Sequence, residues 1–383
     1  MIPYGRQDIS QADINSVIEV LQSEFLTQGP KVPEFEAALA SYCSARYAVA
    51  VNSATSALHL ACLALGVGKG DVVWTTPITF VASANCALYC GASVDFVDID
   101  SKTYNMSAGA LEEKLVKAEK LGVLPKVVIA VHLSGQSCEM VKISALSKQY
   151  GFKIIEDASH AIGGRYKGLP IGGGQYSDIT IFSFHPVKII TTGEGGAALT
   201  NNEFLADKMK CLRSHGVTRD PSLMTKEPDG EWYYQQLELG YNYRMTDLQA
   251  ALGLSQLSRL DSFVSKRHEI AAIYDKELAE LPLALPWQHP DTYSGLHLYI
   301  IRLKSTDVSH QVLFSELRAK GIGVNLHYIP VYMQPFYQAM GFTRGYCEEA
   351  ESYYREAISL PIYTGLQRSE QSQVVSALVD ALR

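Results

Sequence analysis

The stretch IFSFHPVKIITTGEGG, residues 181–196, places a lysine, Lys188, directly after a segment with the character of a buried strand. Two isoleucines and two threonines follow the lysine, and the glycine-rich turn GEGG closes the stretch. Burying an ammonium group is costly unless the group is paired or neutral. Such a lysine indicates either an accident of the local sequence or an amine that takes part in a reaction.

Short runs of apolar and β-branched residues alternate with helical patterns along most of the chain. These runs lie at residues 47–51, 71–75, 94–99, 126–133, 152–157, 179–184 and 195–200. Strands separated by helices indicate βα units and a mostly parallel sheet that is buried on both faces. We therefore predict an α/β fold whose binding sites lie at the C-terminal ends of the strands.

The pattern changes after about residue 245. Residues 246–281 form a long, charged helical pattern of the kind that bridges two domains. Beyond it come apolar runs at 296–303 and 324–329, a helical pattern near 308–320 and two helical patterns at the end of the chain. We predict a large domain over residues 1–255, with its segment 1–30 packing near a smaller α+β domain over residues 256–383.

The composition narrows the classes of protein to consider. Hydrophobic residues make up 47% of the chain and charged residues 19%, as in an ordinary globular protein. The net charge of −7 and the lack of a Lys/Arg run argue against nucleic-acid or membrane-surface partners. Seven scattered cysteines without a CxxC pair predict reduced thiols, with no metal site. The polar N-terminus and the lack of an apolar run of roughly 18 residues predict a cytoplasmic protein.

A carboxylate ends one predicted strand and the lysine follows another. The segment IIEDASHAIGG, residues 154–164, contains Asp157 at its strand end and His160 three residues later. Taken alone, this segment is an ordinary strand-to-loop junction. Because Asp157 and Lys188 would meet at the same sheet edge, however, they suit pyridoxal phosphate (PLP) chemistry, in which a lysine bonds to the cofactor and an aspartate pairs with its pyridine nitrogen.

Two further segments fit the same cofactor. In NSATSALHLA, residues 52–61, Thr55 and Ser56 lie at the start of a helix, where hydroxyls and free N–H groups bind a phosphate. Plain helix capping is the commoner use of such residues. Phe80 begins the helix after the next strand, where its ring would stack on a cofactor or pack in the core.

The chain resembles the DegT/DnrJ/EryC1/StrS family of sugar aminotransferases, which are PLP enzymes of fold type I, the aspartate aminotransferase fold. The resemblance covers essentially the whole chain. It is carried by FLTQGPKVPEFE (25–36), NSATSALHLA, the segment 72–100, EDASHAIGG (156–164), FSFHPVKIITTGEGG (182–196), GYNYRMTDLQAALGLSQL (240–257) and GIGVNLHYIPVYMQPFY (321–337).

The resemblance implies a cofactor site. Lys188 would be the lysine that bonds to PLP, Asp157 would pair with the pyridine nitrogen, and His160 would lie close to the ring. Phe80 matches the stacking aromatic residue. The phosphate-binding positions match Thr55, Ser56 and Ser183. Some relatives have histidine in place of the lysine and dehydrate their substrates, so Lys188 favours transamination.

The resemblance also implies a homodimer with shared active sites. Asn242 matches a phosphate contact supplied by the partner subunit, with Arg244 beside it, and His327 matches a position near the bound sugar nucleotide. Further candidates for contacts with the sugar nucleotide are Tyr4, Arg6, Thr27 and Tyr328.

Within the family, the segments IPYGRQDI, SFHPVKIITTGEGG and NYRMTDLQAALGLSQL are most similar to enzymes that aminate a UDP-linked 4-keto-6-deoxy-N-acetylhexosamine at C4, with L-glutamate as amino donor. A sister enzyme that acts at C4 or C3 of another UDP- or dTDP-keto sugar is an alternative. A non-catalytic regulatory protein of the same fold is a second alternative, which the presence of Lys188 and Asp157 disfavours. A Rossmann oxidoreductase is disfavoured because no GxGxxG turn follows an early strand.

Overall fold

The computed structural model describes residues 1–304 and 308–382, so residues 305–307 and 383 of the predicted small domain lie outside it. Its largest sheet has the strand order β2 (Tyr47–Val51), β10 (Gly196–Thr200), β9 (Ile179–Ser183), β6 (Lys153–Asp157), β5 (Val127–Val131), β3 (Val72–Thr75) and β4 (Ser93–Phe96). All neighbouring strands are parallel except β10, which is antiparallel to both β2 and β9. The seven predicted strands and the mostly parallel sheet are confirmed.

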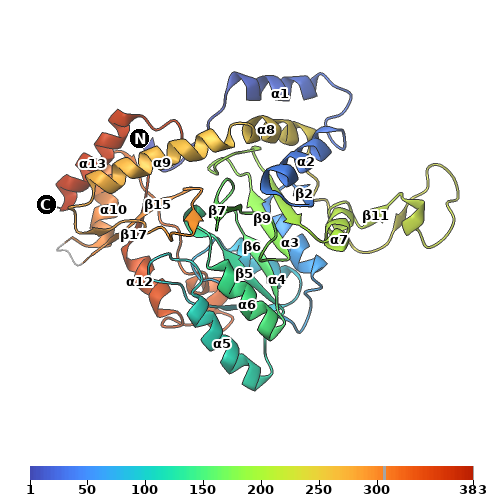
Figure 1. Ribbon diagram of the computed structural model, residues 1–383, viewed down its shortest axis with the longest axis horizontal. Helices are drawn as coiled ribbons and strands as arrows, with labels where there is room; N and C mark the ends of the chain where they lie inside the picture. The colour runs from blue at the N-terminus through green and yellow to red at the C-terminus, as the bar shows by residue number, and fades with distance from the viewer. Residues whose placement is uncertain (305–307, 383) are drawn as a thin grey trace.

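Helices cover both faces of this sheet (Figure 1). The described helices are α1 (Gln11–Leu21), α2 (Lys31–Cys43), α3 (Ala54–Ala64), α4 (Ala82–Tyr89), α5 (Ala108–Leu121), α6 (Met140–Tyr150), α7 (Glu203–Arg213), α8 (Asp247–Leu257), α9 (Leu260–Glu277), α10 (His310–Ala319), α11 (Pro335–Gln338), α12 (Glu348–Glu356) and α13 (Arg368–Leu382). One face of the sheet packs mainly against α3, α4 and α7, and the other against α2, α8, α5 and α6. Side chains on both faces of the strands are therefore buried, as is typical of a mostly parallel sheet.

A separate hydrophobic core lies between α9, α10, α13 and a second sheet. That sheet has the order β13 (Leu283–Ala284), β15 (Tyr299–Leu303) and β17 (Ala357–Leu360). The small domain over residues 256–383 stays a prediction.

Further short strands join distant parts of the chain. β1 (Ile2–Pro3) pairs in parallel with β16 (Ile322–Gly323), so the N-terminus lies on the proposed small domain. The other short strands are β14 (Thr292–Tyr293), β7 (Arg165–Tyr166) and β8 (Leu169–Pro170) in one sheet, and β11 (Val217–Thr218) with β12 (Gln235–Gln236) in a hairpin. This hairpin carries the arm that projects at the right of Figure 1.

The structure corrects two details of the C-terminal half. The predicted helix over residues 246–281 is two helices, α8 and α9, which follow one another in Figure 1. The helix is interrupted at Arg259, whose side chain forms ion pairs with the carboxylates of Asp8 and Asp13 in the N-terminal segment. Strand β17 follows α12 directly, in a region where the sequence predicted only helix. The apolar run at residues 324–329 forms no strand and contains a single isolated bridge at Asn325.

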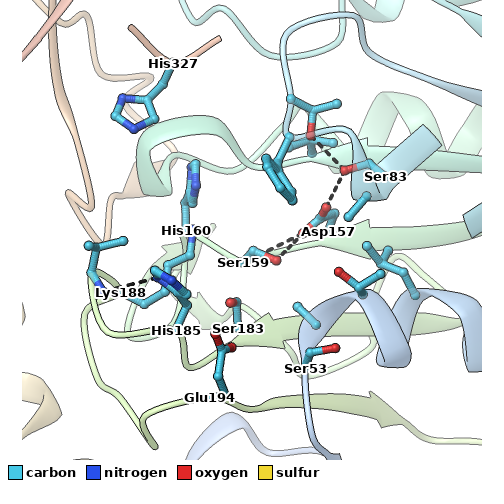
Figure 2. Close-up of a pocket in the computed structure, with 18 of the residues that line it drawn as sticks. Ser53, Ser83, Asp157, Ser159, His160, Ser183, His185, Lys188, Glu194 and His327 are labelled. Carbon is cyan, nitrogen blue, oxygen red and sulfur yellow. Dashed lines mark hydrogen bonds between the residues drawn. The ribbon is translucent and has the colours of Figure 1, made fainter. Parts of the chain in front are cut away.

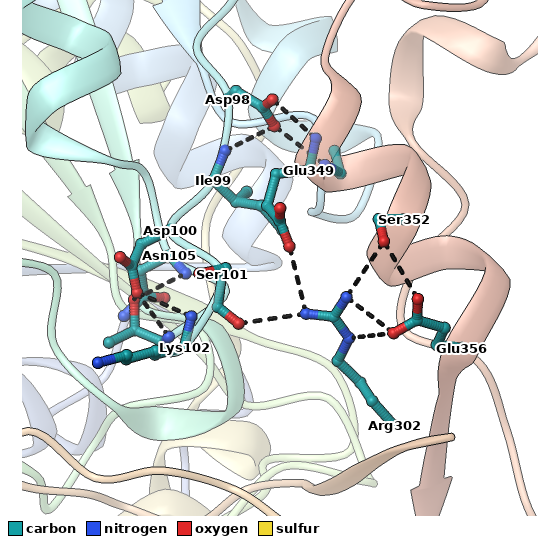
Figure 3. Close-up of polar contacts among 12 residues, drawn as sticks. Asp98, Ile99, Asp100, Ser101, Lys102, Asn105, Arg302, Glu349, Ser352 and Glu356 are labelled. Carbon is teal, nitrogen blue, oxygen red and sulfur yellow. Dashed lines mark hydrogen bonds and ion pairs between the residues drawn. The ribbon is translucent and has the colours of Figure 1, made fainter. Parts of the chain in front are cut away.

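A polar network joins β15 and α12 to the loop after β4 (Figure 3). The Arg302 guanidinium lies 2.8 Å from the Glu356 carboxylate and donates to the Ser101 carbonyl at 3.1 Å. The Asp98 carboxylate accepts the backbone N–H groups of Glu349 and Ala350 at 3.0 Å, which caps the start of α12. These contacts fix the C-terminal elements against the large sheet.

Within the described residues, no helix is long and apolar enough to cross a membrane. No group of three or more His, Cys, Asp or Glu side chains in these residues is arranged to hold a metal ion.

Candidate active site

A cavity of about 880 Å³ lies where strands β5, β6 and β9 end and helix α3 begins. Val131, Asp157 and Ser183, the last residues of these three strands, line it. Most of the predicted site residues meet in this cavity: Tyr4, Thr55, Ser56, Phe80, Asp157, His160, Ser183, Lys188, His327 and Tyr328. Figure 2 shows several of them around the same space. The rule that sites form at the C-terminal ends of parallel strands therefore locates this cavity.

Lys188 lies in the loop between β9 and β10 and is partly buried. Its backbone N–H donates to the His185 carbonyl at 2.9 Å, which forms a tight turn after the strand. Burial lowers the pKa of the Lys188 ammonium to about 8, although the Asp157 carboxylate opposes this shift. A substantial fraction of the amine is therefore neutral near physiological pH and able to act as a base or a nucleophile.

Asp157 is held in one orientation by two serines (Figure 2). Its Oδ2 accepts the Ser83 hydroxyl at 2.7 Å, and Ser83 also contacts the Thr79 hydroxyl at 2.7 Å. Its Oδ1 accepts both the backbone N–H and the hydroxyl of Ser159, at 3.1 and 2.6 Å. An ionised carboxylate has about four acceptor positions, so Asp157 can accept a further donor from the cavity.

His160 has a defined tautomer. Its Nδ1 accepts the backbone N–H of Ser134 at 3.3 Å, so the proton of the neutral ring is on Nε2 and points to the Tyr328 hydroxyl, 3.2 Å away. Burial and the neighbouring Lys188 and His327 lower the pKa of His160 well below its ordinary value, which keeps the ring neutral. The Tyr328 oxygen can then accept from His160 and donate its own proton into the cavity.

Another side of the cavity is formed by Tyr4 of the N-terminal segment and by residues 325–328. The His327 Nδ1 lies 2.8 Å from the Ser359 hydroxyl, and burial and Lys188 lower the pKa of His327 to about 3. The Tyr4 ring packs against His327 with the ring centres 5.1 Å apart. These polar aromatic groups are suited to contact a sugar or its hydroxyls.

Helix α3 turns its N-terminus toward the cavity. Ser53 caps the helix by accepting the backbone N–H of Ser56 at 3.1 Å, and the Ser56 hydroxyl donates to Asn52 at 2.6 Å. Thr55 lies between them on the cavity wall. Hydroxyls and a helix N-terminus together favour an anion such as a phosphate.

Gly196 allows this helix start to lie close to β10. A Cβ atom at Gly196 would be 2.5 Å from the Ala54 nitrogen and 2.6 Å from the Ser53 carbonyl carbon. Such separations are not tolerated between real atoms, so the last glycine of GEGG is required for the close approach.

Four predicted residues do not line the cavity: Arg6, Thr27, Asn242 and Arg244. Arg6, Thr27 and Asn242 are exposed. The Asn242 carbonyl accepts the Asn52 side-chain amide at 3.4 Å, which holds the GYNYRM segment beside the start of α3. Within a single chain, the predicted substrate or phosphate contacts of these four residues stay predictions.

Sequence reasoning missed several residues of the cavity. Ser159 could have been recognised from the sequence, because it follows Asp157 by two residues. An aspartate side chain often accepts the backbone N–H two residues later, and Asp157 does so here. Ser83 and Asn325 had none, because folding brings them to the cavity from other segments. His297 lies behind the cavity, with its ring 4.4 Å from that of His160.

An open α/β fold with a lysine of lowered pKa and an oriented aspartate at its strand ends defines a PLP-dependent transferase of fold type I. The chain belongs to the DegT/DnrJ/EryC1/StrS aminotransferase family, whose model matches residues 7–379. The predicted family, fold class and cofactor are confirmed.

Individual relatives are similar over their full lengths. The chain is 41% identical to the UDP-4-amino-4,6-dideoxy-N-acetyl-beta-L-altrosamine transaminase of Campylobacter jejuni, over 100% of this chain and 98% of that protein. The structure of Helicobacter pylori PseC, an aminotransferase involved in the biosynthesis of pseudoaminic acid, matches with a TM-score of 0.90 and 31% identity, covering 100% of this chain and 99% of the other. Spr1654 of Streptococcus pneumoniae, a proposed sugar aminotransferase in its PMP form, matches with the same TM-score, identity and coverage.

The residues of the cavity fit PLP. The cavity offers the Lys188 amine, which is partly neutral, the Asp157 carboxylate with unused acceptor positions, and hydroxyls at a helix N-terminus. These are the three groups that a pyridoxal aldehyde, a pyridine nitrogen and a phosphate need.

Proposed function

We propose that this PLP-dependent sugar aminotransferase transfers an amino group from L-glutamate to C4 of UDP-2-acetamido-2,6-dideoxy-β-L-arabino-hex-4-ulose. The product would be UDP-4-amino-4,6-dideoxy-N-acetyl-β-L-altrosamine, a precursor of pseudaminic acid, which is used to glycosylate flagellins. The observation that carries the reaction type is the meeting of Lys188, Asp157 and His160 in one cavity. The 41% identity to the Campylobacter jejuni enzyme supports the substrate.

In this proposal Lys188 moves the protons. PLP, when bound, supplies the electron sink that makes the α-carbon of the amino donor acidic. The Lys188 amine removes the proton from that carbon in the first half-reaction and delivers a proton to C4 of the sugar in the second. A pKa of about 8 suits both roles, because a catalyst that gives and takes protons works best when its pKa is near the ambient pH.

The other residues hold and orient the cofactor. Asp157, oriented by Ser83 and Ser159, would accept from the pyridine N–H, and neutral His160 would lie close to the ring. Phe80, which is 59% exposed on the cavity wall, would cover the ring once the cofactor is bound. The phosphate would lie at the start of α3, against Thr55, Ser56 and Ser183.

We also propose that the functional unit is a homodimer. Asn242 lies outside the cavity of its own chain and is exposed, as expected for a residue that reaches the phosphate of a partner subunit. The substrate contacts proposed for Arg6, Thr27 and Arg244 would likewise need the second subunit, whereas Tyr4, His327 and Tyr328 already line the cavity.

An absorbance spectrum followed by substrate addition tests the proposal. L-Glutamate should convert the PLP form of the protein to the PMP form, and the β-L-arabino 4-ulose should restore the first spectrum. Because PseC and Spr1654 match the chain equally well in structure, a sister aminotransferase is the second candidate. Faster restoration by the D-xylo 4-ulose or by a dTDP-keto sugar would replace the proposed substrate, and failure with glutamate would refute the proposed donor.

A further inference from the structure

Helix α3 carries a buried histidine one turn after the residues proposed to hold the phosphate. His59 follows Ser56 by three residues and Thr55 by four, so the three side chains lie on one side of the helix. Thr55 and Ser56 line the cavity, whereas His59 does not and is only 4% exposed. His59 therefore does not reach the cofactor site itself, but it belongs to the next turn of the helix that does.

The ring of His59 makes one hydrogen bond within the described residues. Its Nδ1 lies 3.2 Å from the Tyr243 hydroxyl, whereas its buried Nε2 has no partner in this part of the chain. A buried N–H without a partner is rarer than an unpaired acceptor, so we place the ring proton on Nδ1, which donates to the Tyr243 oxygen. The ring of Tyr241 packs edge-on against His59 at 4.8 Å and stacks on Tyr243 at 5.0 Å. The Tyr243 side chain is therefore held between His59 and Tyr241.

The backbone of Tyr243 continues this connection to the start of α3. Its carbonyl accepts the backbone N–H of Asn52 at 2.9 Å. The side-chain oxygen of Asn52 in turn accepts the Ser56 hydroxyl at 2.6 Å, and both residues line the cavity. A continuous path of hydrogen bonds and covalent bonds therefore runs from the His59 ring through Tyr243 and Asn52 to Ser56, and both of its ends lie on α3.

We propose that His59 is a positioning residue for the phosphate end of the PLP site and acts through Tyr243 and Asn52. This inference rests on the proposed placement of the phosphate at the start of α3. The first N–H groups of a helix have no intrahelical partner, and they bind an anion well only if the first turn keeps its orientation. The path fixes this turn, whereas Asp157 and Lys188 belong to β6 and to the loop after β9. Loss of the His59 hydrogen bond should therefore weaken the hold on the phosphate alone.

Titration of the apoprotein with PLP and with pyridoxal, which lacks the phosphate, tests the proposal. Both ligands carry the same aldehyde and ring, so absorbance follows the binding of each. His59→Phe keeps an aromatic ring and removes the hydrogen bond. It should raise the Kd of PLP by about five- to tenfold, as the loss of one hydrogen bond implies, and leave the Kd of pyridoxal within about twofold. Equal weakening of both ligands would indicate a merely structural role and would overturn the proposal, as would an unchanged Kd of PLP.

Tyr243→Phe removes the same hydrogen bond from a partly exposed residue, and it serves as the test if His59→Phe does not fold. It should cause the same selective loss, and the double variant should lose no more than either single variant, because both break one interaction. Additive losses would contradict the path.

The matched control is Tyr241→Phe, whose hydroxyl makes no hydrogen bond within the described residues, and it should change neither Kd. A natural protein that binds pyridoxal as tightly as PLP would refute the placement of the phosphate and this inference with it. A full preference for PLP in both His59→Phe and Tyr243→Phe would refute only the role of His59.

Discussion

The lowered pKa of Lys188 implies that this residue destabilises the protein without cofactor. Relative to an ordinary lysine pKa of 10.5, a value of about 8 corresponds to about 3 kcal/mol. Because the side chain keeps some contact with solvent, we take the effect as about 2–3 kcal/mol. Lys188→Met removes the charge at similar length, so the variant apoprotein should be more stable than the natural one at pH 7 by about this amount.

The sign of the pH dependence makes the prediction specific. Below about pH 8 the folded apoprotein carries a poorly solvated ammonium, and the full cost is present. Between pH 8 and 10.5 the folded state has lost this proton while the unfolded state retains it, so the stability of the natural protein rises relative to that of the variant. The Lys188→Met advantage should therefore shrink by about 2–3 kcal/mol over this range.

Thermal unfolding of both apoproteins from pH 7 to 10.5 measures the effect. Lys148→Met, which changes an exposed lysine on α6, serves as the control and should show little change in its difference from the natural protein. Parallel curves for the natural protein and Lys188→Met would refute the reasoning, because they would show that folding does not alter the proton affinity of Lys188.

Two further predictions concern packing around the site. Gly196→Ala should push the start of α3 away from β10, weaken PLP binding and destabilise the protein by about 1–3 kcal/mol, measured by cofactor titration and thermal unfolding; Gly109→Ala, whose nearest neighbour would be 3.8 Å away, should do neither. Arg302→Met should destabilise the protein by about 2–4 kcal/mol in the same unfolding assay, because it breaks a largely buried polar network. The control Arg368→Met removes an exposed ion pair and should cost less than about 1 kcal/mol. Equal losses in either pair of variants would contradict the packing argument.

The sheet and the cofactor side of the cavity could be predicted because their signals are local. Each strand of the large sheet is a short apolar run, and parallel strands bring their C-terminal ends to one edge. Asp157 and Lys188 follow two such runs, so their meeting required no knowledge of long-range packing. Strand β17 was missed because its run AISL also fits a buried helical turn, and only pairing with β15 decides between them.

The side of the cavity that carries Tyr4 and His327 depends on the pairing of the N-terminal strand β1 with β16. Ile2 pairs with Ile322 and Pro3 with Gly323, and this pairing carries Tyr4 to the ring of His327. A strand of two residues has no periodicity that a sequence pattern can reveal, and its partner lies more than three hundred residues away. In the proposed site, the groups that would hold the cofactor come from the large sheet, whereas Tyr4 and His327, which would contact the sugar, come from the N-terminal segment and the C-terminal part of the chain. If the proposed roles hold, substitutions at Tyr4 or His327 should change the preferred sugar while Asp157 on β6 and Lys188 after β9 stay in place.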